Sequence, residues 1–295
     1  MKHTFLLAFI LLFTDIQAQI VNKIDTKLMQ KPPGICQDIV IVLKAQADIS
    51  AVKDIKGKEA KATFVYNLLY QNAIETQKEI IQILKDNKIR FRSYYIVNMI
   101  AASCDIEIIK KLSLRNDVAY IIEDGKLTML PAPERDETSS DSRASVWGLN
   151  QIGAPTVWSM GYNGQGVVIG GQDTGYAWEV STIKSKYRGW NGSSANHDYN
   201  WHDAIHQNQY YNPCGADSPV PCDDNNHGTH TMGTMTGDTD DNGDNIGVAP
   251  GAKWIGCRNM DNGDGKLSTY VECFEWFLAP YPVSGGAGDP TKMPH

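Results

Sequence analysis

The strongest constraint on this chain is a short apolar run that ends on a carboxylate. Residues 167–175 read Val-Val-Ile-Gly-Gly-Gln-Asp-Thr-Gly, with glycines bounding the apolar part and Asp173 near its end. Such a run predicts a parallel strand that is covered on both faces. Open α/β sheets place functional groups just past the carboxyl ends of such strands, so Asp173 is a candidate site residue.

A second segment, residues 226–234, supplies a candidate base. It reads Asn-His-Gly-Thr-His-Thr-Met-Gly-Thr and predicts the start of a helix in which Gly228 and Gly233 remove side-chain bulk beside His227. An aspartate that orients an imidazole and a histidine that accepts a proton are two members of a nucleophilic triad. The order along the chain is Asp173, then His227.

These residues also carry a family resemblance. Asp173-Thr174-Gly175, His227-Gly228-Thr229-His230 and residues 246–252 resemble the subtilisin-like serine peptidases (subtilases), in particular their bacillopeptidase F-like branch. The resemblance covers Trp147 to about Pro282. It implies an α/β fold with a doubly wound parallel sheet, a polypeptide substrate, and catalytic roles for Asp173 and His227.

Other interpretations of the same residues fit less well. Asp-Thr-Gly occurs in aspartic proteases, but no second Asp-Thr-Gly or Asp-Ser-Gly is present to share a proton. His227 and His230 have the spacing of zinc ligands, but Gly228 stands where His-Glu-x-x-His has its glutamate. Taken alone, His230 is expected to be a packed helix histidine.

The net charge of the chain bears on nucleic-acid binding. A formal net charge of −7 and the lack of a basic cluster argue against such binding.

The N-terminal residues indicate the compartment. Residues 1–18 have a weakly basic start and a short apolar run, which predicts a cleaved signal peptide and a secreted protein; an uncleaved anchor is the alternative. No later stretch approaches the roughly 20 apolar residues of a membrane helix, so we expect no stable membrane association.

Residues 35–130 predict a small α/β domain. Strand-like stretches at 38–44, 90–101 and 118–122 alternate with helical patterns, one ending near Asn87 on a face that includes Ile74, Ile80 and Leu84, and one at 106–114. The order β-α-β-β-α-β indicates a ferredoxin-like plait. Its position resembles the subtilase propeptide, which implies an intramolecular inhibitor; an unrelated N-terminal adaptor is the alternative.

The remaining chain divides into a linker and the N-terminal part of a subtilase catalytic domain. Residues 131–146 are polar and poor in apolar side chains, so we expect a processing linker there. Residues 147–295 are the catalytic-domain part. Within them, residues 187–211 predict a surface insert whose His197, His202 and His206 lie in a solvated loop and bind no metal.

The cysteines and the oxygen-rich stretches allow further predictions. Cys214 and Cys222 flank a compact loop, which favours a disulfide, whereas Cys257 and Cys273 are either bridged or two buried thiols. Residues 238–245 are rich in oxygen ligands, but the spacing is not that of an EF-hand. We therefore expect no required cofactor; a bound calcium ion is the alternative.

The glycine-bearing stretch around Asp264 is a candidate substrate-binding edge. Gly263, Asp264 and Gly265 match the family's edge strand, where a substrate main chain pairs as an added strand, and the glycines allow a close approach. A plain loop explains the glycines nearly as well.

The sequence lacks the rest of the triad. A subtilase needs a serine in a Gly-Thr-Ser-Met-Ala-like motif and an oxyanion asparagine, and neither motif occurs before His295; Ser284 has no such context. We therefore expect a fragment that is inactive as written. The alternative function is a non-catalytic secreted protease-binding or inhibitor protein.

Overall fold

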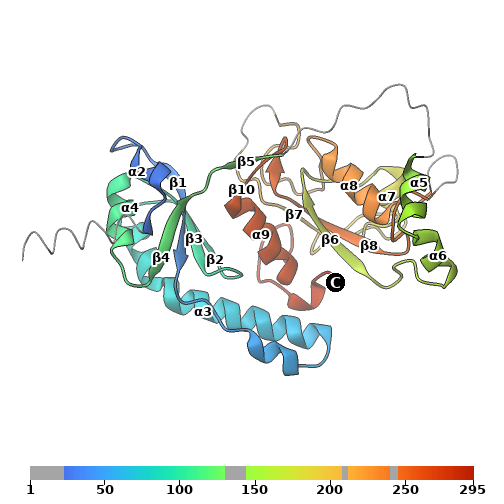
Figure 1. Cartoon of the computed structure of the whole chain (residues 1–295), viewed down its shortest axis with the longest axis horizontal. Coiled ribbons are helices and arrows are strands. Elements are labelled where there is room, and N and C mark those ends of the chain that lie inside the picture. Colours follow the sequence, from blue (N-terminus) through green and yellow to red (C-terminus); the bar gives the residue numbers. More distant parts are fainter. Residues whose placement is uncertain (1–22, 130–143, 208–211, 240–244) are drawn as a thin grey trace, which may run out of the picture. The chain divides into compact units, whose positions relative to one another are not determined.

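The computed structural model describes residues 23–129, 144–207, 212–239 and 245–295 (Figure 1). The chain divides into two compact units, residues 1–125 and residues 126–295. The expected signal peptide and nearly all of the expected processing linker lie outside the described residues. Among the described residues, no helix has the length and apolar character needed to cross a membrane.

The first unit is a four-stranded antiparallel sheet with helices packed on it. Its strands have the order β2-β3-β1-β4, which is the order of a ferredoxin-like plait and confirms that prediction. Its elements are α2 (Thr26–Met29), β1 (Gln37–Leu43), a 3-10 turn (Ser50–Asp54), α3 (Lys58–Asp86), β2 (Phe91–Tyr94), β3 (Met99–Cys104), α4 (Ile106–Ser113) and β4 (Val118–Glu123).

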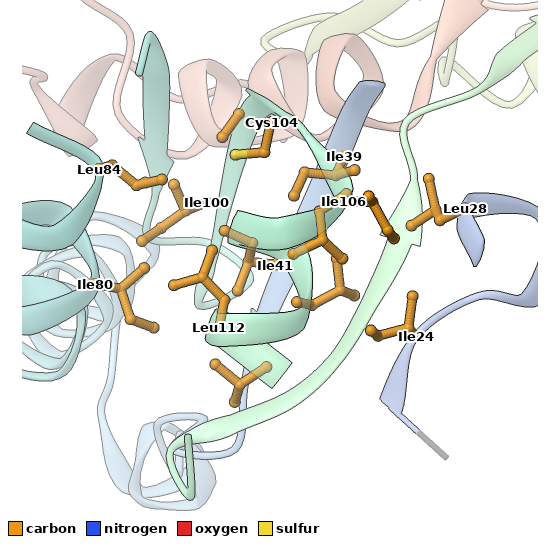
Figure 2. Packing of buried hydrophobic residues seen from close by; sticks show 14 of the residues in the cluster. Ile24, Leu28, Ile39, Ile41, Ile80, Leu84, Ile100, Cys104, Ile106 and Leu112 are labelled. Atoms are coloured by element: carbon orange, nitrogen blue, oxygen red, sulfur yellow. The ribbon is translucent and has the colours of Figure 1, made fainter. Parts of the chain in front are cut away.

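One apolar layer joins the helices of this unit to its sheet (Figure 2). Ile39, Ile41 and Leu43 alternate along β1, as expected for a strand that turns one face to the core. Ile80 and Leu84 of α3 meet them, together with Ile106, Ile109 and Leu112 of α4. Ile74 does not join this layer, contrary to prediction, and its side chain is 51% exposed.

The second unit is built on a three-stranded parallel sheet. β6 (Val168–Asp173), β8 (Lys253–Arg258) and β7 (Trp201–Asp203) lie in that order. Asp173 and Asp203 both pair in register with Arg258, so the three strands end together. The helices are α5 (Ala144–Gln151), α6 (Ala154–Ser159), α7 (Ser181–Lys184), α8 (His227–Thr236) and α9 (Leu267–Leu278), followed by a 3-10 turn (Pro290–Lys292).

Part of the expected surface insert at 187–211 belongs to the core instead, whereas residues 191–194 are exposed, as expected. β7 lies within it, and Tyr187 and Trp201 are fully buried. The prediction was wrong because β7 has only three residues, Trp-His-Asp, and shows no apolar alternation. Tertiary contacts with β8 and Trp254 bury this segment, and its local sequence does not reveal them.

A small antiparallel sheet completes the second unit. It has the order β5-β10-β9, formed by Lys126–Thr128, Asp264–Lys266 and Met260–Asp261. The compact first unit ends at Gly125, and β5 belongs to the second unit.

Two disulfides tie the second unit together. Cys214–Cys222 forms as predicted, and Cys257–Cys273 joins β8 to α9, which decides between the two alternatives left open by the sequence. In the first unit Cys36 and Cys104 are free thiols, and burial raises the pKa of the Cys104 thiol to about 12.

The core of the first unit allows a matched test of burial. Ile41→Ala should lower the free energy of unfolding by about 2–5 kcal/mol, because it removes methyl groups that no neighbour can replace. Ile74→Ala, with the same chemistry at an exposed position of α3, should change it by no more than about 0.5 kcal/mol. Urea unfolding followed by circular dichroism measures both, and equal losses would contradict the assigned core.

Candidate functional site

Asp173 lies at the carboxyl end of β6, in a nearly enclosed position. Its side chain is 11% exposed. The backbone N–H of Thr174 donates to Asp173 Oδ1 at 2.7 Å, and the hydroxyl of Thr231 donates to Oδ2 at 3.0 Å. Both carboxylate oxygens are therefore held by donors that fix the plane of the group.

His227 is the first residue of α8 and faces this carboxylate. Its Nδ1 lies 2.7 Å from Asp173 Oδ1, and its side chain is 41% exposed. A carboxylate acceptor at this distance favours the tautomer with the proton on Nδ1, which leaves a lone pair on Nε2. The structure thus brings together the two residues predicted from sequence and leaves His227 accessible to a substrate.

This approach of α8 to β6 depends on missing side chains. A Cβ atom on Gly228 would lie 2.0 Å from the carbonyl oxygen of Gly175, and one on Gly175 would lie 1.8 Å from that of Cys222. Gly175 also has a φ of +106°, which disfavours other residues. Gly233 was expected to serve the same close packing, but a Cβ there would meet nothing nearer than 3.9 Å.

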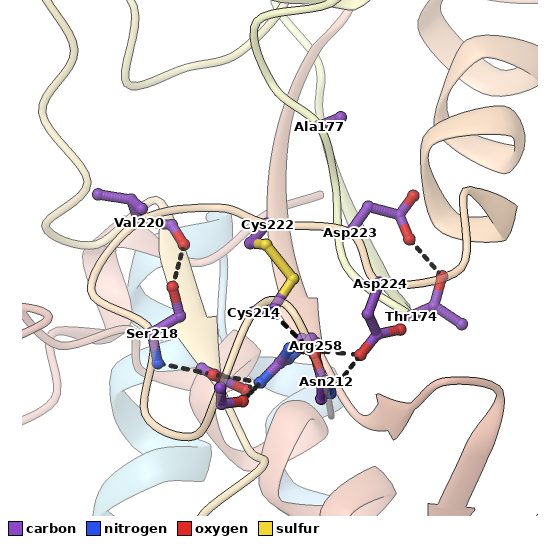
Figure 3. The surroundings of a disulfide bond; sticks show 12 residues. Thr174, Ala177, Asn212, Cys214, Ser218, Val220, Cys222, Asp223, Asp224 and Arg258 are labelled. Atoms are coloured by element: carbon purple, nitrogen blue, oxygen red, sulfur yellow. Dashed lines mark hydrogen bonds and ion pairs between the residues drawn. A yellow bond between two sulfur atoms is a disulfide. The ribbon is translucent and has the colours of Figure 1, made fainter. Parts of the chain in front are cut away.

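Three residues of the site escaped the sequence analysis. Thr231 bonds Asp173 from the next turn of α8, and Thr174 and Asp223 form a hydrogen-bonded link beside the pair. Asp223 comes directly after the loop closed by Cys214–Cys222 (Figure 3). The threonines lie in the quoted motifs, so their positions were visible, whereas nothing local marks Asp223.

The charged side chains beneath this loop form a buried network. Arg258 is fully buried and donates to both carboxylate oxygens of Asp203, at 3.0 and 2.8 Å. It also donates to Asp224 Oδ2 at 3.3 Å (Figure 3). Buried charges need such partners, and these contacts fix the end of β8 beside the end of β6.

Tyr176 fills the space behind the pair. It is fully buried against Gly171 and Gly256, where any Cβ would lie within 2.5 Å of its ring or hydroxyl. Burial raises the pKa of Tyr176 well above its ordinary value, and the charges of Asp173 and Asp223 raise it further. Tyr176 therefore remains neutral beside the carboxylates.

The insert histidines differ in their surroundings: His202 lies in β7, which corrects the expected solvated loop, whereas His206 lies after β7 and is exposed, as expected. His202 Nε2 lies 2.7 Å from Oε1 of the buried Glu272, and His206 Nε2 lies 2.9 Å from the same oxygen. His197 contacts the hydroxyl of Tyr187 at 3.0 Å, and burial lowers the pKa of His197. His230, expected to be packed, is exposed on α8.

The described residues offer no evident metal centre. In those ranges, no three or more His, Cys, Asp or Glu side chains are arranged to hold a metal ion. Five residues of the oxygen-rich stretch, 240–244, lie outside the described ranges. Asp238, at its start, forms an ion pair with Lys186 at 2.8 Å.

The candidate substrate edge carries a paired strand in the structure. β10 pairs antiparallel with β5, with Asp264 opposite Thr128 and Gly265 opposite Leu127. The N–H of Met129 also donates to the carbonyl of Gly263 at 2.8 Å. The edge thus accepts an extended main chain, here from residues 126–129, and a substrate role for Gly263, Asp264 and Gly265 remains a prediction.

Comparison with known proteins identifies the family. The model of the subtilase family, peptidase S8, matches residues 164–280, which include Asp173 and His227. Bacillopeptidase F of Bacillus subtilis is 32% identical over 260 residues, covering 82% of this chain and 17% of that protein. The chain belongs to the subtilase family. Subtilisin E of Bacillus subtilis is 27% identical over 196 residues, covering 64% of this chain and 41% of the other.

A solved structure of a serine protease supports the fold. The epidermin leader peptide processing serine protease of Staphylococcus aureus, as its S393A mutant, matches with a TM-score of 0.53 at 15% identity. The match covers 82% of this subtilase chain and 48% of that one. The chain spans less than half the length of each of these relatives.

Two glycines of α8 provide a matched test of the close approach. Gly228→Ala should destabilise the second unit by about 1–3 kcal/mol, because the new methyl group overlaps the Gly175 carbonyl. Gly233→Ala should be neutral or stabilise by up to about 1 kcal/mol, since alanine favours a helix and the site has room. Thermal unfolding of both variants measures this, and equal effects would contradict the described packing.

Proposed function

We propose that this chain is the N-terminal part of a secreted serine endopeptidase, with Asp173 and His227 as two members of an Asp–His–Ser triad. The observation that carries the proposal is the 2.7 Å contact between His227 Nδ1 and Asp173 Oδ1, made by a nearly enclosed carboxylate and an accessible imidazole. Membership in the subtilase family supports the reaction class.

The geometry supports defined roles for the two residues. His227 Nε2 would take the proton of the serine hydroxyl as the hydroxyl attacks the peptide carbonyl, and would then pass it to the leaving amine. Asp173 would hold the Nδ1–H and stabilise the imidazolium. The nucleophile and the oxyanion asparagine are not among the 295 residues in their family motifs, so we propose that the chain as written does not hydrolyse peptides.

The paired edge strand supports an extended polypeptide substrate. β10 offers main-chain hydrogen bonds that depend little on sequence, as in other peptide recognition by strand addition. We infer that a substrate segment takes the place on β10 that residues 126–129 occupy, with Gly263 and Gly265 close to its main chain. A Cβ on Gly265 would lie 2.6 Å from the Tyr270 ring, so this backbone position is restricted to glycine.

The first unit is proposed as the propeptide and intramolecular inhibitor. It folds around its own core, and the next residues in the chain form β5, the strand that pairs with β10. The two disulfides of the second unit suit an oxidising compartment, which supports secretion through the leader at residues 1–18.

A second candidate is a non-catalytic, secreted protease-binding protein. The first unit has a complete ferredoxin-like sheet, while the 295 residues hold no serine in the family motif. In that case the first unit would bind another peptidase. Inhibition of a purified subtilase by the 295-residue chain, with no activity from any longer product of the gene, would favour this function.

The test uses the product of the whole reading frame that encodes this chain. Its product should cleave casein, and Asp173→Asn should lower kcat by about 10⁴-fold, because asparagine cannot hold His227 in the required tautomer. Asp217→Asn, which removes an exposed carboxylate outside the pair, should leave kcat unchanged.

Two results would contradict the proposal. One is an Asp173→Asn variant that keeps its activity in the whole product. The other is hydrolysis of the same substrate by the 295-residue chain alone. That chain would first be purified through an affinity tag at each end, which removes contaminating peptidases.

A further inference from the structure

The Asp223 carboxylate accepts five hydrogen bonds. Its Oδ1 accepts from the Thr174 hydroxyl at 2.8 Å and from the N–H groups of Asn225 and Asn226, at 3.1 and 2.9 Å. Its Oδ2 accepts from the N–H of Thr229 at 2.8 Å and from the Thr229 hydroxyl. One carboxylate thus collects donors from two separate segments.

These segments hold the neighbours of both reactive residues. Thr174 directly follows Asp173, and its own N–H bonds the Asp173 carboxylate. On the other side, Asn226 and Gly228 flank His227, and the Gly228 N–H donates to the Thr174 hydroxyl oxygen at 3.0 Å. The chain of contacts therefore runs from the end of β6 through Thr174 and Asp223 to the first turn of α8.

The first turn of α8 is not capped by the side chain of its own N-cap residue. Asn226, at the N-cap position, has a φ of 68° and its side chain makes no capping hydrogen bond. The orphan N–H groups of Gly228 and Thr229 are taken instead by Thr174 and Asp223. A negative carboxylate is also favoured at this end of a helix dipole.

We propose that Asp223 is a positioning residue that, through Thr174, holds His227 Nδ1 at hydrogen-bond distance from Asp173. This proposal rests on the proposed function, because Asp173 and His227 are the two residues that the proposed function makes catalytic. Asp223 contacts neither side chain of that pair in the hydrogen bonds of the described residues, so it acts through the Thr174 hydroxyl on one side and through the backbone at the start of α8 on the other.

A helix cap alone would predict a different behaviour. If Asp223 only stabilised α8, its bonds to Asn225, Asn226 and Thr229 would suffice, and the link to Thr174 would not matter for the position of His227. If Asp223 positions His227, Thr174→Val should disturb the pair, although this variant also removes the bond from the Gly228 N–H to the Thr174 hydroxyl. An undisturbed pair in Thr174→Val would therefore rule out positioning through Thr174.

The first measurement needs no catalysis. In the 295-residue chain, a ring N–H held against a carboxylate exchanges slowly and gives a proton resonance far downfield. We expect this Nδ1–H signal of His227 in the wild type and in the charge-matched control Asp217→Asn. Asp223→Asn and Thr174→Val should each lose or broaden it, with far-ultraviolet circular dichroism unchanged.

The second measurement uses the whole reading-frame product. Asp223→Asn should lower kcat about 10- to 100-fold with KM within about twofold, as expected for a misplaced base rather than a lost binding contact. Asp223→Glu, which keeps the charge, should recover part of kcat.

The two measurements separate the hypotheses. An unchanged Nδ1–H signal in a folded Thr174→Val variant would overturn the positioning role, as would a kcat unaffected by Asp223→Asn. A whole product without peptidase activity would overturn the proposed function, and the resonance in the 295-residue chain would still decide the role of Asp223.

Discussion

The site depends on the close approach of the α8 N-terminus to the end of β6. Gly228 and Gly175 touch backbone to backbone, and Gly175 in turn lies against the carbonyl of Cys222. Any side chain at these two glycines would separate the segments. Because none is present, His227 Nδ1 and Asp173 Oδ1 lie 2.7 Å apart.

The parallel sheet gives this approach a fixed base. β6, β7 and β8 end in register, so Asp173, Asp203 and Arg258 lie at one edge of the sheet. The bidentate contact between Arg258 and Asp203 is fully buried, and breaking it would leave an uncompensated charge. The loop closed by Cys214–Cys222 covers this ion pair and leads directly into Asp223, so core, loop and site form one continuous structure.

Much of this arrangement was predictable where local patterns are strong. The β-branched composition of β1 and the helical patterns of α3 and α4 predicted the ferredoxin-like unit, and glycine-bounded motifs predicted Asp173 and His227. Periodicity failed where tertiary contacts decide. β7 is too short to show a period, and Ile74 lies on a helix longer than the sheet it covers.

Polar contacts between distant segments were the least visible in the sequence. Asp223 is one of two adjacent aspartates, and only the fold distinguishes the one that meets Thr174 from Asp224, which meets Arg258. In the same way, Glu272 lies 70 residues from His202, so no local pattern marks their contact. Hydrogen-bond partners of this kind need the assembled backbone.

The most direct test of the account is the tautomer of His227, read from the nitrogen chemical shifts of its ring in the isotopically labelled 295-residue chain at neutral pH. The account predicts a protonated Nδ1 and an unprotonated Nε2, because the Asp173 carboxylate accepts from Nδ1. A ring protonated on Nε2 alone would contradict it, since that imidazole has no lone pair facing the substrate side and is not held by Asp173.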